Sequence, residues 1–578
     1  MHTATLSTDA PLTGDFEPLR VSDVKRPRPL PSIPVPAAST ISLVPTKPPT
    51  RPRKSKAFWL CLIALMLSDI LSALDLTAIG TALPTIANAL DDRRGDYIWV
   101  GSAYALASTA FIPLSGNLAD VFGRKPVMLA SIVFFAIGST LAGAAQNMSM
   151  MITSRSIQGI GGGGILALAR IITTDLVPLA ERGIYQGLLG LVWCLASFIG
   201  PPIGGALSSR GLNAWRWLFF LNLPLCAIAF TLVALFLLVR APTGSVRRKI
   251  VKVDWIGSFI IFLGTAFAIL GLTWAGIRYP WSSAQVLCPL IMGLFLLVAA
   301  GFYEANVPPT LPTIPPDIVG DWTSLLGLLT TAVHGITSIS LIYYLPVFFQ
   351  ACFGASPIRS SVDFLPGSLI TAPASLVAGI VISASGKYRP VNWIGWTAMI
   401  VGFGLVSTYS NDTPVAKWVG YQIVGAVGVG LIFVGPIFPI LAPLPTHRAA
   451  SANALFAFTR AFAQTWGITI SSTILQNRLE KELPAAFVAQ FSPGFEIAYA
   501  AIPAIRQLEG PLKTAVQAAF AKSMNVVWQT MVGISGLGLL LSLFLKEVPM
   551  GTTVDENYAL LEGELLDEKG MDGVRDEA

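Results

Sequence analysis

The chain has 578 residues, of which 53% are hydrophobic and only 12% are charged. A soluble globular protein carries about 25% charged residues, so this chain has too little polar surface to coat a water-soluble particle. We therefore expect it in a lipid bilayer. Its net charge of +6 does not indicate a nucleic-acid partner, because the basic residues lie mainly beside apolar segments.

The sequence carries no combination of residues that predicts catalysis. The five cysteines have no paired spacing, and no metal-ligand cluster, nucleotide-binding loop or nucleophile–base set is visible. We expect neither an enzyme nor a bound metal or other cofactor. The missing Walker sequence also disfavours a pump driven by ATP.

Both ends of the chain are polar. Residues 1–56 are rich in Pro, Ser, Thr and basic residues, and this composition predicts a disordered, basic cytoplasmic tail. No cleavable signal peptide is expected, because the first apolar run begins only at Ala57. Residues 546–578 form an acidic tail that is expected to be solvated and unstructured.

Between the tails, fourteen apolar segments are each long enough to cross a bilayer as a helix. If the N-terminal tail is cytoplasmic, the loops that face the cytoplasm carry more basic residues than the short loops on the other side. An even number of helices then places both tails in the cytoplasm. We expect 476–523 to be a long outward loop, and the whole chain to be an all-α, multi-pass membrane protein. The segments lie near residues 57–79, 97–118, 126–145, 150–174, 184–207, 217–239, 254–274, 286–304, 323–345, 361–384, 391–409, 418–441, 450–475 and 525–545.

An internal repeat divides these segments. Gly116 is followed seven residues later by Gly123, and Gly379 is followed seven residues later by Gly386, each time beside basic residues. Each loop follows the second helix of a six-helix block, which suits a transporter built from parallel repeats. The repeat predicts a first six-helix bundle at 57–239, a linker with two extra helices at 240–304 and a second six-helix bundle at 305–545.

The first repeated loop suits a tight turn between two helices. Glycines permit a close helix approach and a positive φ, and Asp120 can accept hydrogen bonds from a neighbouring helix N-terminus. Arg124 and Lys125 are expected to stay in the aqueous interface. A structural turn with anchoring charges is the alternative interpretation. The residues concerned are Gly116, Asp120, Gly123, Arg124 and Lys125.

This loop resembles the signature loop of the major facilitator superfamily, which locks the two halves of the transporter together in the outward-open state. The resemblance makes the five residues a predicted gating loop. Val121 stands where the family often has a basic residue.

The first apolar segment contains a carboxylate at Asp75. A carboxylate inside an apolar span is costly and usually faces a cavity or a partner, and a group that can cycle between charged and neutral forms suits proton coupling. The segment resembles the first-helix signature of the fourteen-helix drug:proton antiporters, whose aspartate corresponds to Asp75. The alternative is an Asp that simply reaches water. Asp69 lies about 240° away around the helix, so the two carboxylates do not share a face, and we assign Asp69 no role.

The fourth segment contains Arg155, with Gln158 on the same helix face and four consecutive glycines soon after. A guanidinium there stays charged and needs an acceptor or a wet cavity, and the glycines allow close helix packing. The segment resembles the antiporters' fourth-helix motif, whose arginine is associated with proton transfer. An arginine that only caps neighbouring carbonyl groups is the alternative.

The fifth segment combines glycines with two prolines, which together predict a closely packed hinge. The residues are Gly200, Pro201, Pro202, Gly204 and Gly205. This stretch resembles the antiporter motif of exporters, although Ala196 replaces its first glycine.

The resemblance implies that the first and fourth helices of each half line a central substrate cavity. Gln158 and Gln422 also form a weak echo between the two halves. His334 could bind substrate, although a lone membrane histidine is more often a neutral hydrogen-bonding residue. Aromatic side chains could face apolar or cationic ligands or form an interfacial belt instead. The candidate cavity residues are Gln158, His334, Tyr343, Tyr344 and Gln422.

The resemblance covers roughly residues 57–545. It implies a major facilitator fold of two six-helix bundles plus two extra helices, and proton-driven export of small organic molecules such as drugs, toxins or secondary metabolites. The expected partners are a small organic substrate, protons and the lipid bilayer, and the expected state is a monomer in the plasma membrane or, as the alternative, the vacuolar membrane. Rival interpretations are a vacuolar transporter of basic amino acids, a siderophore carrier and a nutrient sensor that does not transport.

Overall fold

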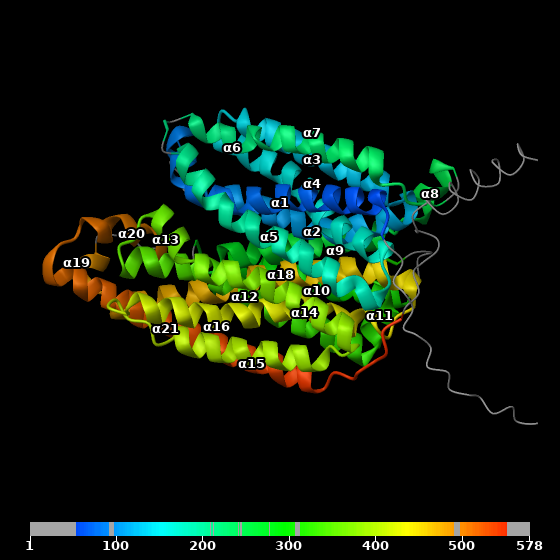
Figure 1. The fold of residues 1–578 in the computed structure, drawn as a ribbon. Helices are drawn as coiled ribbons and strands as arrows, with labels where there is room; N and C mark the ends of the chain where they lie inside the picture. Colours follow the sequence, from blue (N-terminus) through cyan, green and yellow to red (C-terminus); the bar gives the residue numbers. More distant parts are fainter. Residues whose placement is uncertain are drawn as a thin grey trace, which may run out of the picture. The chain divides into compact units, whose positions relative to one another are not determined.

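The computed structural model describes residues 54–551 except for short segments at 92–96, 209, 212, 241, 243–244, 277, 307–311 and 490–496. Of the two predicted tails, only residues 54–56 and 546–551 are therefore described, and the rest of both tails lies outside the described residues. Within these limits the chain forms α-helices and short 3₁₀ turns, with no β-strand among the described residues (Figure 1).

The first six predicted segments form one bundle. α1 packs against α5 and α7, whereas α2 and α3 both pack against α4. The glycines of α4 allow this close packing, because a Cβ on Gly161 would collide with the backbone of Phe135, and a Cβ on Gly163 with the backbone of Ser108. The helices are α1 (Lys56–Ala89), α2 (Ile98–Phe122), α3 (Arg124–Gly143), α4 (Met148–Leu176), α5 (Leu179–Ser208), α6 (Trp217–Phe220) and α7 (Asn222–Phe236).

Four helices follow between the bundles: α8 (Val246–Lys252), α9 (Trp255–Trp274), α10 (Ala284–Asn306) and α11 (Pro316–Gly320). α9 and α10 pack against each other, and α9 also contacts α2 and α18, one helix from each bundle. Most of α10 is exposed, with large apolar side chains such as Phe295 and Phe302 on its surface. Such a surface suits contact with lipid.

The last six predicted segments form the second bundle. α14 packs against α16, α15 against α16 and α21, and α12 against α18 and α21. The helices are α12 (Trp322–Cys352), α13 (Pro357–Asp363), α14 (Leu365–Ser385), α15 (Arg389–Val406), α16 (Val415–Val434), α17 (Ile437–Leu441), α18 (Ala449–Glu482), α19 (Ala485–Val488), α20 (Ile497–Gln507) and α21 (Gly510–Leu543).

All fourteen predicted segments are helical, with short breaks between α6 and α7, α13 and α14, and α16 and α17. Eleven helical spans in the described part of the chain are long and apolar enough to cross a membrane. The other three segments, α5, α15 and α18, are helices of 30, 18 and 34 residues. The predicted all-α, multi-pass fold is confirmed.

The prediction that residues 476–523 form a long loop is wrong. α18 continues to Glu482, α19 and α20 follow, and α21 begins at Gly510. These extensions are helical because they bury an apolar stripe, which includes Leu479, Phe487 and Ile505, against the core of the second bundle. In Figure 1, α19 and α20 lie at the opposite end of the bundles from α8 and α11.

The two bundles meet along two lines of contact. α5 packs against α14 on one side, and α18 packs against α2 and α4 on the other. We call both lines together the seam. The two repeated loops turn at left-handed glycines, Gly123 with φ 98° and Gly386 with φ 69°, as the repeat predicts. We call the end of the bundles that carries these loops the glycine-turn end.

The seam is tightly packed at the glycine-turn end. A Cβ on Gly116 would lie 2.7 Å from the Cβ of Ala454 on α18, and a Cβ on Gly183 would lie 2.6 Å from the carbonyl oxygen of Gly379 on α14. Real Cβ atoms do not approach other atoms so closely. Glycine therefore lets the α5 and α14 backbones touch each other, and lets Ala454 of α18 pack directly on the α2 backbone.

Candidate functional site

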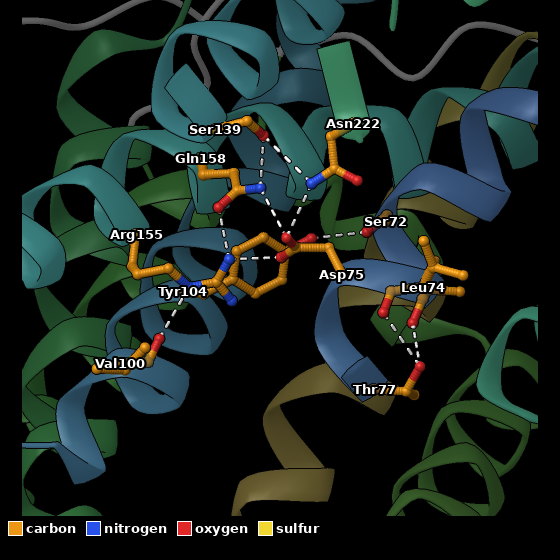
Figure 2. Close-up of polar contacts among 11 residues, drawn as sticks. Ser72, Leu74, Asp75, Thr77, Val100, Tyr104, Ser139, Arg155, Gln158 and Asn222 are labelled. Atoms are coloured by element: carbon orange, nitrogen blue, oxygen red, sulfur yellow. Dashed lines mark hydrogen bonds and ion pairs between the residues drawn. The ribbon is translucent and has the colours of Figure 1, made fainter. Parts of the chain in front are cut away.

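A buried polar network surrounds Asp75 inside the first bundle (Figure 2). The Asp75 carboxylate lies 2.5 Å from Nη1 of Arg155 on α4. Its other oxygen accepts hydrogen bonds from Nε2 of Gln158 at 2.8 Å and from Nδ2 of Asn222 on α7 at 3.1 Å. Side chains from α4 and α7 thus converge on a carboxylate of α1.

The network is closed to solvent. Arg155, Gln158 and Asn222 are each 0% exposed, and Asp75 is 4% exposed. The interpretation of Asp75 as an Asp that simply reaches water is therefore wrong for this arrangement. Three donors stabilise the negative charge of Asp75 here, and one of them is a cation.

Arg155 is held from several sides. Its Nε donates to the carbonyl oxygen of Val100 at 2.9 Å, and its Nη1 also lies 2.5 Å from Oε1 of Gln158. The guanidinium stacks over the Tyr104 ring, 4.4 Å from its centroid. Arg155 therefore caps a carbonyl group and pairs with Asp75 at the same time. Its Nη2 is buried without a hydrogen-bond partner among the described residues.

Further polar residues support the network, and none of them was predicted to belong to it. Ser139 on α3 accepts from Gln158 at 2.8 Å and from Asn222 at 3.4 Å. The hydroxyl groups of Tyr104 and Ser72 lie 2.8 Å apart. A polar side chain inside an apolar span usually finds a polar partner, so Asn222 and Ser139 were visible as signals. Nothing in the sequence indicated that both would face Asp75.

The predicted gating loop contains a second buried ion pair. Arg124 Nη1 lies 2.7 Å from Asp120, and its Nε lies 2.9 Å from Asp175 at the end of α4. Arg124 is only 2% exposed, so the expectation that it stays in the aqueous interface is wrong, whereas Lys125 is half-buried. Arg124 is buried because two carboxylates compensate its charge. Asp175 was missed in the sequence.

The gating loop also reaches the second bundle. The Ser451 hydroxyl, in the first turn of α18, donates to Asp120 at 3.3 Å. This contact agrees with the expectation that Asp120 accepts hydrogen bonds near a neighbouring helix N-terminus. Together with the Gly116–Ala454 approach, it joins α2 to α18 across the seam.

The predicted hinge lies on α5, which stays helical through Pro201 and Pro202. Gly200 packs against Thr77 on α1, and a Cβ there would collide with the Thr77 hydroxyl and lie 3.0 Å from the Ala78 nitrogen. Thr77 is fixed by hydrogen bonds to the carbonyl groups of Ala73 and Leu74. Gly200, the first residue of the predicted hinge, therefore contacts Thr77 on α1, two residues after Asp75 in the chain.

Replacing Gly200 with alanine is expected to destabilise the protein by about 1–3 kcal/mol and to slow transport, because overpacking pushes α5 away from α1. Gly205→Ala is the matched control: its Cβ would lie an ordinary 3.4 Å from Ile358, and alanine has the higher helix propensity. Thermal unfolding in detergent measures both variants. Equal unfolding temperatures would contradict the proposed close contact.

The candidate cavity residues do not lie together. Gln158 belongs to the Asp75 network, and Gln422 donates to the carbonyl oxygen of Asp363 at 3.1 Å within the second bundle. The Tyr344 hydroxyl donates to the carbonyl oxygen of Ile468, whereas Tyr343 is 41% exposed. His334 is buried beside Phe433, and its Nε2 lies 3.2 Å from the carbonyl oxygen of Val429.

Asp69 makes no hydrogen bond to the Asp75 network among the described residues. It lies near Arg170 on α4, close enough for electrostatic interaction but without a direct ion pair among the described residues. In the part of the chain that the structure describes, no three His, Cys, Asp or Glu side chains are placed to hold a metal ion.

Comparison with known proteins places this geometry in a family. The family model described as Major Facilitator Superfamily matches residues 65–468. "Efflux pump FUS6" of Gibberella moniliformis is 36% identical over 521 residues, which cover 89% of this chain and 92% of that protein. "MFS-type efflux pump LUC4" of a Fusarium species is 35% identical over 91% of this chain and 94% of that protein. "MFS-type transporter gkaD" of Penicillium citrinum is 35% identical over 89% and 88%.

Solved structures share the fold at low identity. The human organic anion transporter MFSD10 is 16% identical with a TM-score of 0.52, over 85% of this chain and all of that one. The proton:xylose symporter XylE is 13% identical with a TM-score of 0.56, over 86% of this chain and 99% of that one. With the two bundles, the buried charge pairs and the matched family model, the chain belongs to the Major Facilitator Superfamily and is a multi-pass membrane transporter.

Proposed function

We propose that this protein exports small organic molecules in exchange for protons, with Asp75 and Arg155 as the proton-coupling pair. The observation that carries the proposal is the solvent-free network in which Asp75 is held by Arg155, Gln158 and Asn222. A buried carboxylate can be charged or protonated, and the side chains around it pack differently in the two states. Relatives named as efflux pumps, at about 35% identity, support the direction of transport.

In this proposal the glycine-turn end faces the cytoplasm, together with both tails, and the protein works as a monomer in the plasma membrane. The basic loops of this end support that orientation. The contacts at Gly116–Ala454 and Asp120–Ser451 then close the cytoplasmic end of the seam. The gating loop stabilises this closed arrangement, and its release opens the transporter inward.

Proton binding affects the seam through α1 and α5. A proton on Asp75 removes the charge that Arg155 compensates, so the network rearranges around α1. Thr77 lies two residues away and contacts Gly200 on α5, which packs along α14 at the seam. The two protonation states of Asp75 thereby favour different arrangements of the bundles, which is the condition for coupling. His334, Tyr343, Tyr344 and Gln422 on α12 and α16, with Gln158 on α4, remain proposed contacts for substrate.

The test is substrate-driven proton flux in proteoliposomes, with a panel of aromatic acids, neutral aromatics and cationic dyes. Wild-type protein is expected to move protons only when one of these compounds is present. Asp75→Asn is expected to abolish that flux, because an amide keeps the size of the side chain but accepts no proton. The control is Asp412→Asn, the same change at an exposed position.

Three outcomes are informative. Compound-dependent flux that disappears only in Asp75→Asn supports the proposal. Flux that survives in Asp75→Asn contradicts the assignment of Asp75, and Asp69→Asn then tests the other buried carboxylate of α1. Folded wild-type protein that moves no protons with any compound contradicts proton-coupled export.

A further inference from the structure

A second group of buried residues lies at the seam, and the proposed coupling mechanism does not use it. Its charged members are Asp69 on α1, Arg170 on α4 and Arg460 on α18, so they come from both bundles. We call the group the seam cluster. It consists of Asp69, Arg170, His334, Phe433, Phe456 and Arg460, all buried except Phe433, which is partly buried.

Two aromatic rings connect the two arginines of the seam cluster. The Arg460 guanidinium lies 4.5 Å from the Phe433 ring centroid and 4.4 Å from that of Phe456. The Arg170 guanidinium lies 6.0 Å and 5.8 Å from the same two centroids. One cation from each bundle is thus placed against a shared pair of rings.

The charges of the seam cluster do not balance. Asp69 is its one carboxylate, against two arginines, and it interacts electrostatically with Arg170. The two guanidinium groups repel each other. Among the described residues, Arg460 makes no salt bridge, and its Nη2 donates only to the carbonyl oxygen of Phe433, at 2.7 Å. A buried cation without an anion is costly.

Donor groups in the seam cluster also lack acceptors. Nε and Nη1 of Arg460 are buried without a hydrogen-bond partner among the described residues. Nδ1 of His334 also has no partner there, but it is an acceptor, because Nε2 donates to the Val429 carbonyl oxygen. Arg460 is 5% exposed and His334 is 1% exposed, so bulk water does not satisfy these atoms. Nη2 carries two N–H groups and uses one on the Phe433 carbonyl. Its other N–H can pair with Nε or with Nη1 to form a fork that binds a carboxylate with two parallel hydrogen bonds.

We infer that the seam cluster binds an organic anion, a planar carboxylic acid whose carboxylate takes such a fork of Arg460 and whose apolar body packs beside Phe433 and Phe456. This inference rests on the proposed function, because it names the substrate class of the same transporter. Arg170 adds a second positive charge from the opposite bundle, so an anion at the seam compensates cations of both halves. The rings supply the apolar surface for the rest of the molecule.

Binding of cinnamate and of its uncharged methyl ester to the purified full-length protein in detergent tests the inference. Calorimetry measures the affinities, and thermal unfolding shows that each variant is folded. Wild-type protein is expected to bind the acid about tenfold or more tightly than the ester, since the ester cannot accept the charge-assisted pair of hydrogen bonds. Arg460→Gln is expected to remove this preference, and Arg460→Lys to retain part of it.

The matched control is Arg389→Gln, which removes an arginine that stacks on the Trp393 ring away from the seam, 4.8 Å from its centroid. It is expected to keep the preference for the acid. Equal binding of acid and ester by wild-type protein, no binding of the acid, or an undiminished preference in folded Arg460→Gln would each overturn the inference.

Transport by proteoliposomes separates this inference from the proposed function. If the protein transports neutral or cationic compounds in exchange for protons but does not bind the acid, the proposed export function is supported and the anion site is contradicted. If binding of the acid depends on Arg460 but no proton-coupled transport occurs, the anion site is supported and the proposed export function is contradicted.

Discussion

Arg155→Leu is expected to destabilise the protein by about 3–5 kcal/mol and to abolish transport. The substitution leaves the Asp75 carboxylate buried without its cation, and an uncompensated buried charge is among the most costly defects in a protein. The Val100 carbonyl loses its donor in the same change, and the Tyr104 ring loses the guanidinium stacked on it. Thermal unfolding in detergent and flux in proteoliposomes measure the two effects.

Two further variants show whether the charge or the shape of Arg155 matters. Arg155→Lys keeps the charge but loses the planar fork that serves Asp75, Gln158 and Val100 at once, so it is expected to recover only part of the stability. Asp75→Asn combined with Arg155→Leu removes both charges and is expected to unfold at a higher temperature than Arg155→Leu alone, without recovering transport. If the double variant is no more stable than Arg155→Leu, the buried pair is not the source of the cost.

Arg124→Ala is expected to destabilise the protein by a similar amount, about 3–5 kcal/mol, and to weaken closure at the glycine-turn end. The carboxylates of Asp120 and Asp175 both contact Arg124, and without it Asp175 would be left buried and Asp120 partly buried. Their repulsion would separate the end of α2 from the end of α4, and Asp120 would lose its fixed position opposite Ser451 on α18.

Lys125→Ala is the matched control, because Lys125 is the adjacent cation but only half-buried. It is expected to cost less than about 1 kcal/mol, as exposed charges usually do. Adding Asp175→Asn to Arg124→Ala is expected to restore part of the stability by removing one of the two carboxylates. Thermal unfolding of all three proteins measures this series, and equal losses from Arg124→Ala and Lys125→Ala would show that the buried contacts contribute nothing.

The sequence predicted the charged centre of the site better than its surroundings. Asp75 and Arg155 stand out because charges are rare inside apolar spans, and Gln158 follows Arg155 at a spacing that places both on one helix face. Asn222 is 147 residues from Asp75 in the chain, and their contact depends on how α7 packs against α1. Helix periodicity contains no information on such packing.

Burial was the property that the sequence predicted least well. Arg124 follows a turn at the end of a span, where a basic residue normally reaches water, and only the approach of Asp175 from α4 makes its burial favourable. The helices α19 and α20 were missed for a related reason. Hydropathy detects segments long enough to cross a bilayer, whereas Ile505 lies in a shorter apolar stretch that is buried by protein.

The facing glycines at the α5–α14 contact have a consequence for the speed of the transport cycle. Interlocked side chains must leave their grooves before one helix can roll over another, and each such step adds to the activation barrier. At Gly183 and Gly379 the two backbones touch with no side chain between them. We therefore expect this contact to add little to the activation barrier for relative rotation of the bundles.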